Sequence, residues 1–74
     1  MLVDGNLRHL KVLVAIDEEG SLAAAGRKLG LSLPSISRIL SQAEVDLGGP
    51  LFERSARRCQ ATVAGRLVVE RITR

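Results

Sequence analysis

Aromatic residues are almost missing from this 74-residue sequence, which has no tryptophan or tyrosine and a single phenylalanine, Phe52. Proteins that bind single-stranded nucleic acid stack bases on aromatic side chains, so this mode of binding is disfavoured. The core must come from Leu, Ile, Val and Ala, as in packed helices. A chain of this length has room for one domain, whose single core gives only a few kcal/mol of stability.

Cysteine and histidine occur once each, as Cys59 and His9. A single cysteine forms no internal disulfide, which agrees with a reducing compartment. Without a cluster of His, Cys and carboxylates or a glycine-rich phosphate loop, we expect no enzyme, no cofactor and no metal. The longest apolar run, residues 12–16, is too short to span a bilayer, and no signal peptide is recognisable. We therefore expect a soluble, cytoplasmic protein without a membrane partner.

Charge is unevenly distributed along the chain, whose net charge is +3. Residues 1–20 carry two basic and four acidic side chains, a net charge of −2, whereas residues 21–74 carry nine basic and four acidic side chains, a net charge of +5. This asymmetry suits a polyanionic partner on one side of the molecule. A solvated basic face is the alternative.

Two short helices are predicted before residue 31. Residues 6–19 have one apolar stripe at helical spacing, between an N-cap at Asn6 and a stop at Gly20. The stripe consists of Leu7, Leu10, Leu13 and Val14. Ser21 caps the second helix, whose apolar side is Leu22, Ala25, Gly26 and Leu29. Because glycine inside a helix costs about 1 kcal/mol relative to alanine, Gly26 indicates the close approach of another helix.

The third predicted helix has two different faces. Ser32 caps it and Pro34 lies in its first turn. At about 100° per residue, its apolar arc contains Ile36, Ile39, Leu40, Ala43 and Leu47. Its opposite arc contains Pro34, Ser35, Ser37, Arg38, Ser41 and Gln42. No carboxylate precedes Glu44, so this face can approach phosphates without repulsion, unless it is simply a serine-rich solvent face.

A hairpin and a last helix are predicted after the Gly48-Gly49-Pro50 breaker. Residues 51–54 and 58–61 form the two strands, with Phe52 as a core anchor and Cys59 as a small apolar residue. Arg54, Arg57 and Arg58 lie near the tip. Thr62 caps a helix from residue 63 onward, whose apolar side packs on the first helix or meets a partner.

This order of elements is a winged helix-turn-helix arrangement, and five segments allow a narrower comparison. They are N-L-R-H-L at 6–10, E-E-G-S at 18–21, S-x-P-S-I-S-R at 32–38, L-F-E-R-S-A-R-R at 51–58 and T-V-A-G at 62–65. Together they resemble the DNA-binding domain of LysR-type transcriptional regulators over nearly the whole chain. The resemblance implies a mainly α fold: a three-helix core, a two-stranded β-hairpin wing and a C-terminal linker helix.

The resemblance also implies roles for individual residues. The recognition helix, about 33–47, would lie in the major groove, and the wing, about 51–61, on the backbone or minor groove. The expected DNA-contacting residues are Ser21, Ser32, Leu33, Pro34, Ser35, Ser37, Arg38, Gln42, Arg54, Arg57 and Arg58. Residues 1–61 would form the DNA-binding domain, and residues 62–74 the start of a helix that pairs two subunits through Leu67, Val68 and Ile72. Arg38 is the best candidate for a guanine, because a guanidinium bonds O6 and N7 together.

Three residues depart from the pattern of this family. Leu33 stands where Gln is most common, so it either recognises a thymine methyl group or weakens binding. Ala23 replaces a common Thr and removes an expected phosphate contact. Ala43 replaces a core leucine, a truncation that costs about 2–5 kcal/mol when nothing compensates for it.

We therefore expect sequence-specific, double-stranded-DNA binding by a homodimeric bacterial transcription regulator associated with the nucleoid. The alternative is a degenerate winged-helix module that dimerises, binds other proteins and binds DNA weakly. Full-length members of the family continue into an effector-binding domain, which this sequence lacks. We expect a fragment of a longer regulator rather than a natural short protein, and no small-molecule effector site within the chain.

Overall fold

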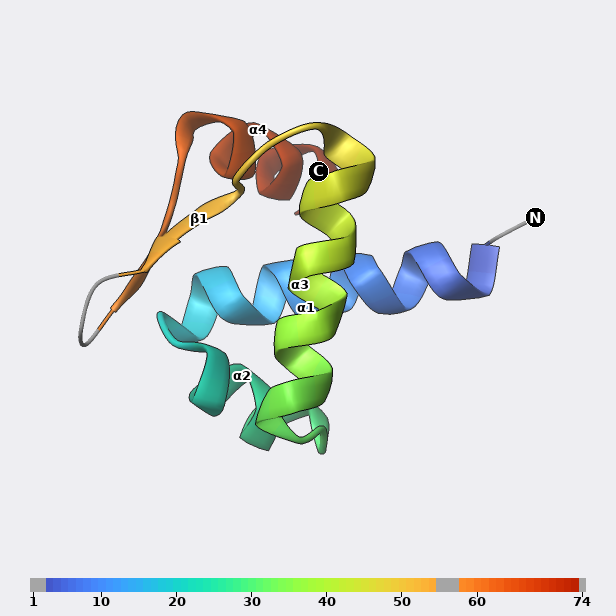
Figure 1. Cartoon of the computed structure of the whole chain (residues 1–74), viewed down its shortest axis with the longest axis vertical. Coiled ribbons are helices and arrows are strands. Elements are labelled where there is room, and N and C mark those ends of the chain that lie inside the picture. The colour runs from blue at the N-terminus through green and yellow to red at the C-terminus, as the bar shows by residue number, and fades with distance from the viewer. Residues whose placement is uncertain (1–2, 55–57, 74) are drawn as a thin grey trace.

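A computed structural model describes residues 3–54 and 58–73, with side chains at residues 8–53 and 58–72. The elements follow the order α1 (Val3–Glu19), α2 (Leu22–Leu29), α3 (Leu33–Leu47), β1 (Phe52–Arg54), β2 (Cys59–Ala61) and α4 (Val63–Thr73) (Figure 1). β1 and β2 pair antiparallel, with Phe52 opposite Ala61 and Arg54 opposite Cys59. The predicted mainly α architecture, with three helices, a hairpin wing and a C-terminal helix, is confirmed. The predicted turn at residues 55–57 lies outside the described residues.

α1 begins earlier than the sequence suggested. Asn6 lies inside the helix rather than at its cap, so the predicted N-cap is wrong. The predicted stop is confirmed, because Gly20 has φ +74° and its N–H donates to the Ile16 carbonyl at 2.9 Å.

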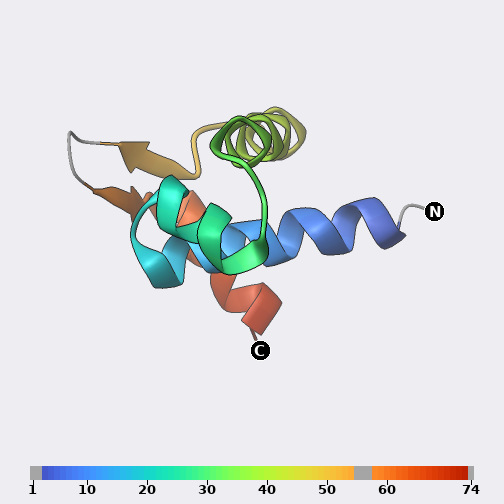
Figure 2. The ribbon, with the colours of Figure 1, turned by 90° about the horizontal axis from the view of Figure 1, so that it is seen from below.

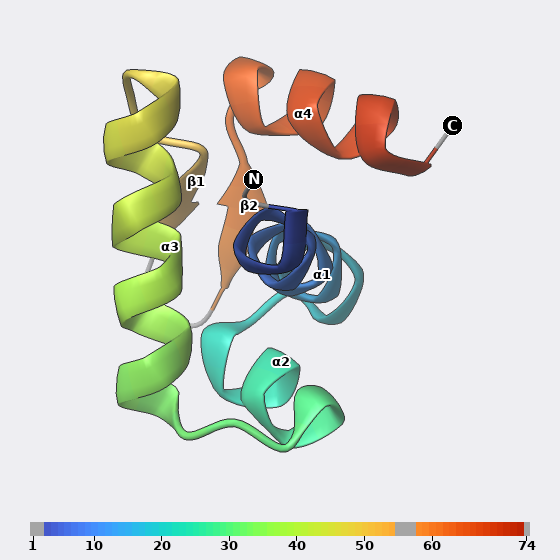
Figure 3. The ribbon, with the colours of Figure 1, turned by 90° about the vertical axis from the view of Figure 1, so that its right-hand side faces the viewer.

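α1 is the central element, and α2, α3 and α4 lie around it when it is viewed end on (Figure 3). Its fully buried side chains are Val12, Leu13, Ala15 and Ile16. The predicted narrow stripe was therefore partly wrong, since Leu10 and Val14 are only half-buried. The buried surface is wider because α1 contacts α2, α3, β2 and α4.

The turn between α2 and α3 is built on a close approach at Gly26. A Cβ atom at Gly26 would lie 2.6 Å from the Leu31 carbonyl oxygen and 3.4 Å from Cγ1 of Ile36 in α3. The sequence predicted that another helix approaches Gly26. The nearest group is instead the backbone of the turn at Leu31, and the Ile36 side chain of α3 is the next nearest. Gly30 ends α2 with φ +71°, and the Leu31 N–H donates to the Gly26 carbonyl at 2.8 Å. This geometry sets the direction in which the chain leaves α2 and enters α3.

α3 has the bounds that the sequence predicted, and its apolar arc packs inward with one exception. Ile36, Leu40 and Ala43 are buried, and Ile39 is half-buried against the core. Leu47 is 55% exposed, so its assignment to the core was wrong. The C-terminal part of α3 extends beyond α1 (Figure 1), and a helical-angle argument does not show where the neighbouring helices stop.

A chain of hydrogen bonds ties the end of α3 to the start of α4. The Glu44 carboxylate accepts from the Leu51 N–H at 2.8 Å, and the Leu51 carbonyl accepts from the Thr62 N–H at 2.9 Å. Thr62 Oγ1 donates to the Pro50 carbonyl at 2.8 Å and accepts from the Gly65 N–H at 3.0 Å. Thr62 is therefore the predicted N-cap of α4, and it also fastens α4 to the segment before β1.

The hairpin is anchored to the body at both strands. Phe52 and Cys59 are 5% and 6% exposed, which confirms their predicted burial. The Cys59 N–H donates to the Gly20 carbonyl at 3.0 Å, so β2 is bonded to the end of α1. β2 begins at Cys59, one residue later than predicted. The wing therefore leaves the body from a fixed base.

α4 uses one side for packing and leaves another uncovered. Val69 is buried, and Val68 and Ile72 are partly buried against the core. Val63 and Leu67 are 80% and 56% exposed. None of the helices in the described part of the chain has both the length and the apolar character needed to cross a membrane.

We expect Gly65→Ala to lower the free energy of unfolding by about 1–3 kcal/mol, as overpacking generally does. A Cβ atom there would lie 1.9 Å from the Leu51 carbonyl oxygen, a backbone atom held by Thr62. Urea unfolding of the two proteins measures the difference. Gly49→Ala is the matched control, because a Cβ atom at Gly49 meets nothing within 4 Å. Equal stability of the two variants would show that the backbone at Leu51 and Gly65 shifts at little energetic cost to accommodate the methyl group.

Candidate nucleic-acid interface

α3 forms one edge of the molecule, and its outward side is the candidate interface (Figure 2). The Ser32 cap is exposed, and so are five residues of the helix up to Gln42: Leu33, Pro34, Arg38, Ser41 and Gln42. Ser35 and Ser37 are half-buried along the same side. The first turn contains no acidic residue. The surface thus combines the positive end of a helix dipole with short hydroxyls and one guanidinium.

Two hydroxyl groups are held together at the start of α3. Ser32 Oγ accepts from the Ser35 N–H at 3.3 Å and donates to Ser35 Oγ at 3.0 Å. Ser32 is therefore the predicted cap. The Ser35 hydroxyl accepts this bond and keeps its own proton for an outside acceptor, such as a phosphate oxygen.

Arg38 lies one turn further along the exposed side. Among the described residues, its side chain has no ion pair and no hydrogen bond. The described part of the chain therefore uses none of the five N–H donors of the guanidinium. A guanidinium without an internal partner can bond a guanine edge or a phosphate through two parallel hydrogen bonds.

Gln42 already has a partner in the next turn. Its Nε2 donates to Asp46 Oδ1 at 3.0 Å, and both side chains are exposed. This pair brings a carboxylate next to the predicted contact face, and the i, i+4 spacing of the two residues is the sequence signal that could have predicted it. Gln42 can offer its carbonyl oxygen as it stands, or exchange Asp46 for a base edge.

Ser21 lies at the start of α2, away from the α3 cap. It is half-buried, and its Oγ accepts from the Ala24 N–H at 3.0 Å. The Ser21 hydroxyl oxygen caps α2, and the hydroxyl proton can still be donated to another acceptor. The neighbouring Ala23 is exposed and offers no polar group.

The wing arginines are only partly described. Arg54 takes part in β1 through its backbone, and Arg57 lies outside the described residues. Arg58 is exposed beside β2, where it lines a polar hollow of about 290 Å³ together with Asp17 and Arg66. Arg66 was missed by the sequence reasoning. Its position four residues after the Thr62 cap could have placed it beside the hairpin, since residues i and i+4 share a helix face.

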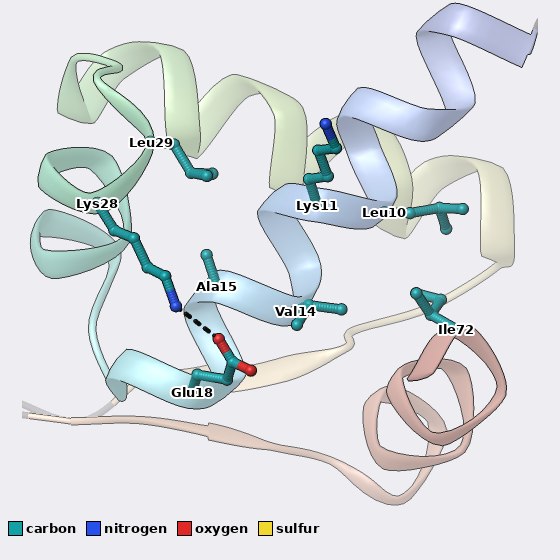
Figure 4. A pocket seen from close by; sticks show the side chains of 8 residues that line it. All are labelled: Leu10, Lys11, Val14, Ala15, Glu18, Lys28, Leu29 and Ile72. Atoms are coloured by element: carbon teal, nitrogen blue, oxygen red, sulfur yellow. Dashed lines mark hydrogen bonds and ion pairs between the residues drawn. The ribbon is translucent and has the colours of Figure 1, made fainter. Parts of the chain in front are cut away.

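A second, mostly apolar hollow of about 370 Å³ lies between α1, α2 and the end of α4 (Figure 4). Its wall includes Leu29 and Ile72, and Lys28 closes one side by pairing with Glu18 at 2.7 Å and with Glu19 at 3.7 Å. The hydrogen bond and the charge of Glu18 raise the pKa of Lys28 above its ordinary value of 10.5. Lys28 therefore stays charged at neutral pH and partly neutralises the acidic end of α1.

The two hollows contain no obvious metal site. Within the described ranges, no three His, Cys, Asp or Glu side chains come together in a way that could hold a metal ion.

The end of α4 reaches the side of α1 that faces away from α3 (Figure 3). The apolar hollow is therefore separate from the polar surface of α3.

Comparison with known proteins gives one consistent family. Residues 7–66 match the family model described as a bacterial regulatory helix-turn-helix protein of the lysR family. A small neutral protease regulatory protein of Streptomyces coelicolor is 46% identical over 65 residues, which is 88% of this chain and 20% of the relative. The transcriptional regulator ClcR of Pseudomonas putida is 43% identical over 63 residues, which is 85% of this chain and 21% of the relative. The chain thus spans about one fifth of the length of these curated relatives.

Solved structures agree with these relatives. The crystal structure of a CbnR DNA-binding domain in complex with DNA has a TM-score of 0.86 and 41% identity, covering 89% of this chain and 76% of that chain. The BenM DNA-binding domain in complex with catB site 1 DNA has a TM-score of 0.86 and 36% identity, covering 90% and 74% of the two chains.

We expect Ser32→Ala to lower the free energy of unfolding by about 0.5–2 kcal/mol, the usual cost of a lost N-cap. Hydrogen exchange of the Ser35 amide should become faster, because that N–H loses its acceptor. Ser41→Ala is the control: Ser41 is exposed on the same helix and makes no hydrogen bond from its side chain to another described residue. An unchanged Ser35 exchange rate in Ser32→Ala would contradict the cap.

Proposed function

The chain belongs to the lysR family of bacterial regulatory helix-turn-helix proteins, and from this premise we propose that it binds double-stranded DNA in a sequence-specific manner. The observation that carries the proposal is the outward side of α3. It presents a guanidinium that pairs with no described residue, together with a hydroxyl pair, and the sequence has no carboxylate between Ser32 and Gln42. Such a surface suits a groove lined by phosphates. DNA complexes of the matching CbnR and BenM domains support it.

Each group on α3 has a proposed task. Ser32, Ser35 and Ser37 bond phosphates or bases near the first turn, and Arg38 bonds the O6 and N7 atoms of a guanine. Gln42 contacts the duplex one turn later, after exchanging its bond to Asp46. The helix then supplies both the position of the protein and part of its sequence preference.

The wing and α2 would hold the duplex on either side of α3. Arg54, Arg57 and Arg58 would contact the backbone or the minor groove, and Ser21 a phosphate. Arg66 would add a further positive charge beside Arg58, since both line the polar hollow. These contacts are to phosphates and sugars, so they strengthen binding without selecting a sequence.

We further propose that residues 1–61 act as the DNA-binding unit and residues 62–74 as the beginning of a linker helix that pairs two copies. Leu67 is 56% exposed on α4, whereas Val68 and Ile72, which are one turn apart on one face, are partly buried against the core. Two copies would place their recognition helices in successive major grooves of an interrupted palindrome. This pairing would serve transcription regulation at the nucleoid. The proposed activity is binding rather than catalysis.

Arg38→Ala should weaken binding to a preferred duplex by about 1–3 kcal/mol and relax discrimination at one base pair. Fluorescence anisotropy against a panel of single-base variants measures both effects. Lys11→Ala removes the same charge from the wall of the apolar hollow, so it should have little effect. An equal loss for Arg38→Ala on every duplex would make Arg38 a phosphate contact instead.

The salt dependence of the same titration separates DNA binding from the alternative of a protein-interaction module. Each neutralised phosphate contributes a slope of about −0.9 to the plot of log K against log salt concentration. Pairing through an apolar helix face does not give such a slope. Sequence-indifferent binding to all duplexes would contradict the proposed function.

Leu67→Glu should shift the association of the chain toward the monomer, because a charge would enter the proposed interface. Sedimentation velocity over a range of protein concentrations measures the shift. Val45→Glu is the matched control, since Val45 is 74% exposed on α3 and lies outside the proposed interface. Dissociation constants that are the same for both variants and the unchanged chain would place the interface elsewhere.

A further inference from the structure

Leu33 is an exposed aliphatic side chain at the tip of the proposed recognition helix. It is the first residue of α3 and is 50% exposed, whereas Ile36 in the next turn is fully buried. Leu33 belongs neither to the core nor to the half-buried side chains packed against it. About half of its apolar surface is therefore open to a partner.

The position of this side chain is fixed by the turn that precedes it. Gly30 adopts φ +71°, and Leu31 is bonded to Gly26 at 2.8 Å. Ser32 caps the helix through the Ser35 N–H, and Pro34 restricts the backbone of the first turn. Leu33 is thus held at a defined place between groups that suit phosphates.

An aliphatic group at this place requires an apolar partner in the duplex. In the major groove, the edges of the four bases present hydrogen-bond donors and acceptors, and thymine alone among them adds a C5-methyl group. We propose that Leu33 contacts the C5-methyl group of a thymine and makes a T·A pair preferred at one position of each half-site. This inference rests on the proposed DNA binding by α3 and names one base that the helix selects.

Val45 and Leu47, the other large aliphatic side chains exposed on α3, do not fit this task, because both lie near its end. Val45 is 74% exposed, but it lies twelve residues after Leu33. At a rise of about 1.5 Å per residue, the two are about 18 Å apart along the axis. The major groove is about 12 Å wide, so a helix that enters by its first turn leaves Val45 near or beyond the groove wall. Val45 therefore provides a matched control on the same helix.

Deletion of single methyl groups tests the contact. A preferred duplex is first selected from random sequences with the 74-residue chain, and each thymine is then replaced by deoxyuridine, which lacks only the methyl group. At one position in each half-site, the replacement should weaken binding about three- to fivefold, the effect of exposing one methyl-sized group. In Leu33→Ala the same replacement should have no effect, whereas in Val45→Ala the loss should equal that of the unchanged chain.

Circular dichroism and urea unfolding establish that both variants are folded, as expected for two exposed side chains. Selective binding without any methyl-dependent position, or a deoxyuridine effect that persists in Leu33→Ala, would overturn this inference and leave the proposed function intact. A failure to select any preferred duplex would overturn both.

Discussion

Close packing of small side chains around α1 is the constraint on which the rest of the structure depends. With a single aromatic residue, the core is built from aliphatic side chains on elements that approach one another closely. At Gly26 and Gly65 a methyl group would meet a backbone carbonyl at 2.6 Å and 1.9 Å. Ala15, Ala25 and Ala43 are also buried in this core. Since such interiors tolerate little extra volume, these positions decide how α3 and α4 are placed.

The candidate interface follows from that placement. α3 is held from the inside by Ile36 and Leu40, from its start by the Ser32 cap, and from its end by the bond between Glu44 and Leu51. Its outward side is then exposed and carries groups that suit phosphates and base edges. The same bonds continue through Thr62 into α4, so the proposed pairing helix and the proposed recognition helix share one hydrogen-bonded junction.

The sequence predicted most elements because their signals are local. Ser21, Ser32 and Thr62 cap their helices as expected, and Gly20, Gly30 and Gly48 end helices with positive φ angles. Two predictions were wrong. Leu47 follows the apolar period but is exposed, and Asn6 is a common cap residue but lies within α1. Arg66 was not recognised as a neighbour of Arg58 because the two belong to different elements. Arg66 lies in α4 and Arg58 directly before β2, and only the packing of α4 beside the hairpin brings them to one hollow.

The sequence by itself determined the order of helices and strands, the caps, the contrast between the two faces of α3 and the family resemblance, because each depends on residue type and spacing along the chain. Only the tertiary structure decided that Leu33 stands outside the core and that α4 covers α1 with one side and leaves Leu67 exposed. These properties depend on which surfaces meet in space. A helical period tells which side chains share a face, but the neighbouring elements determine how much of that face is covered.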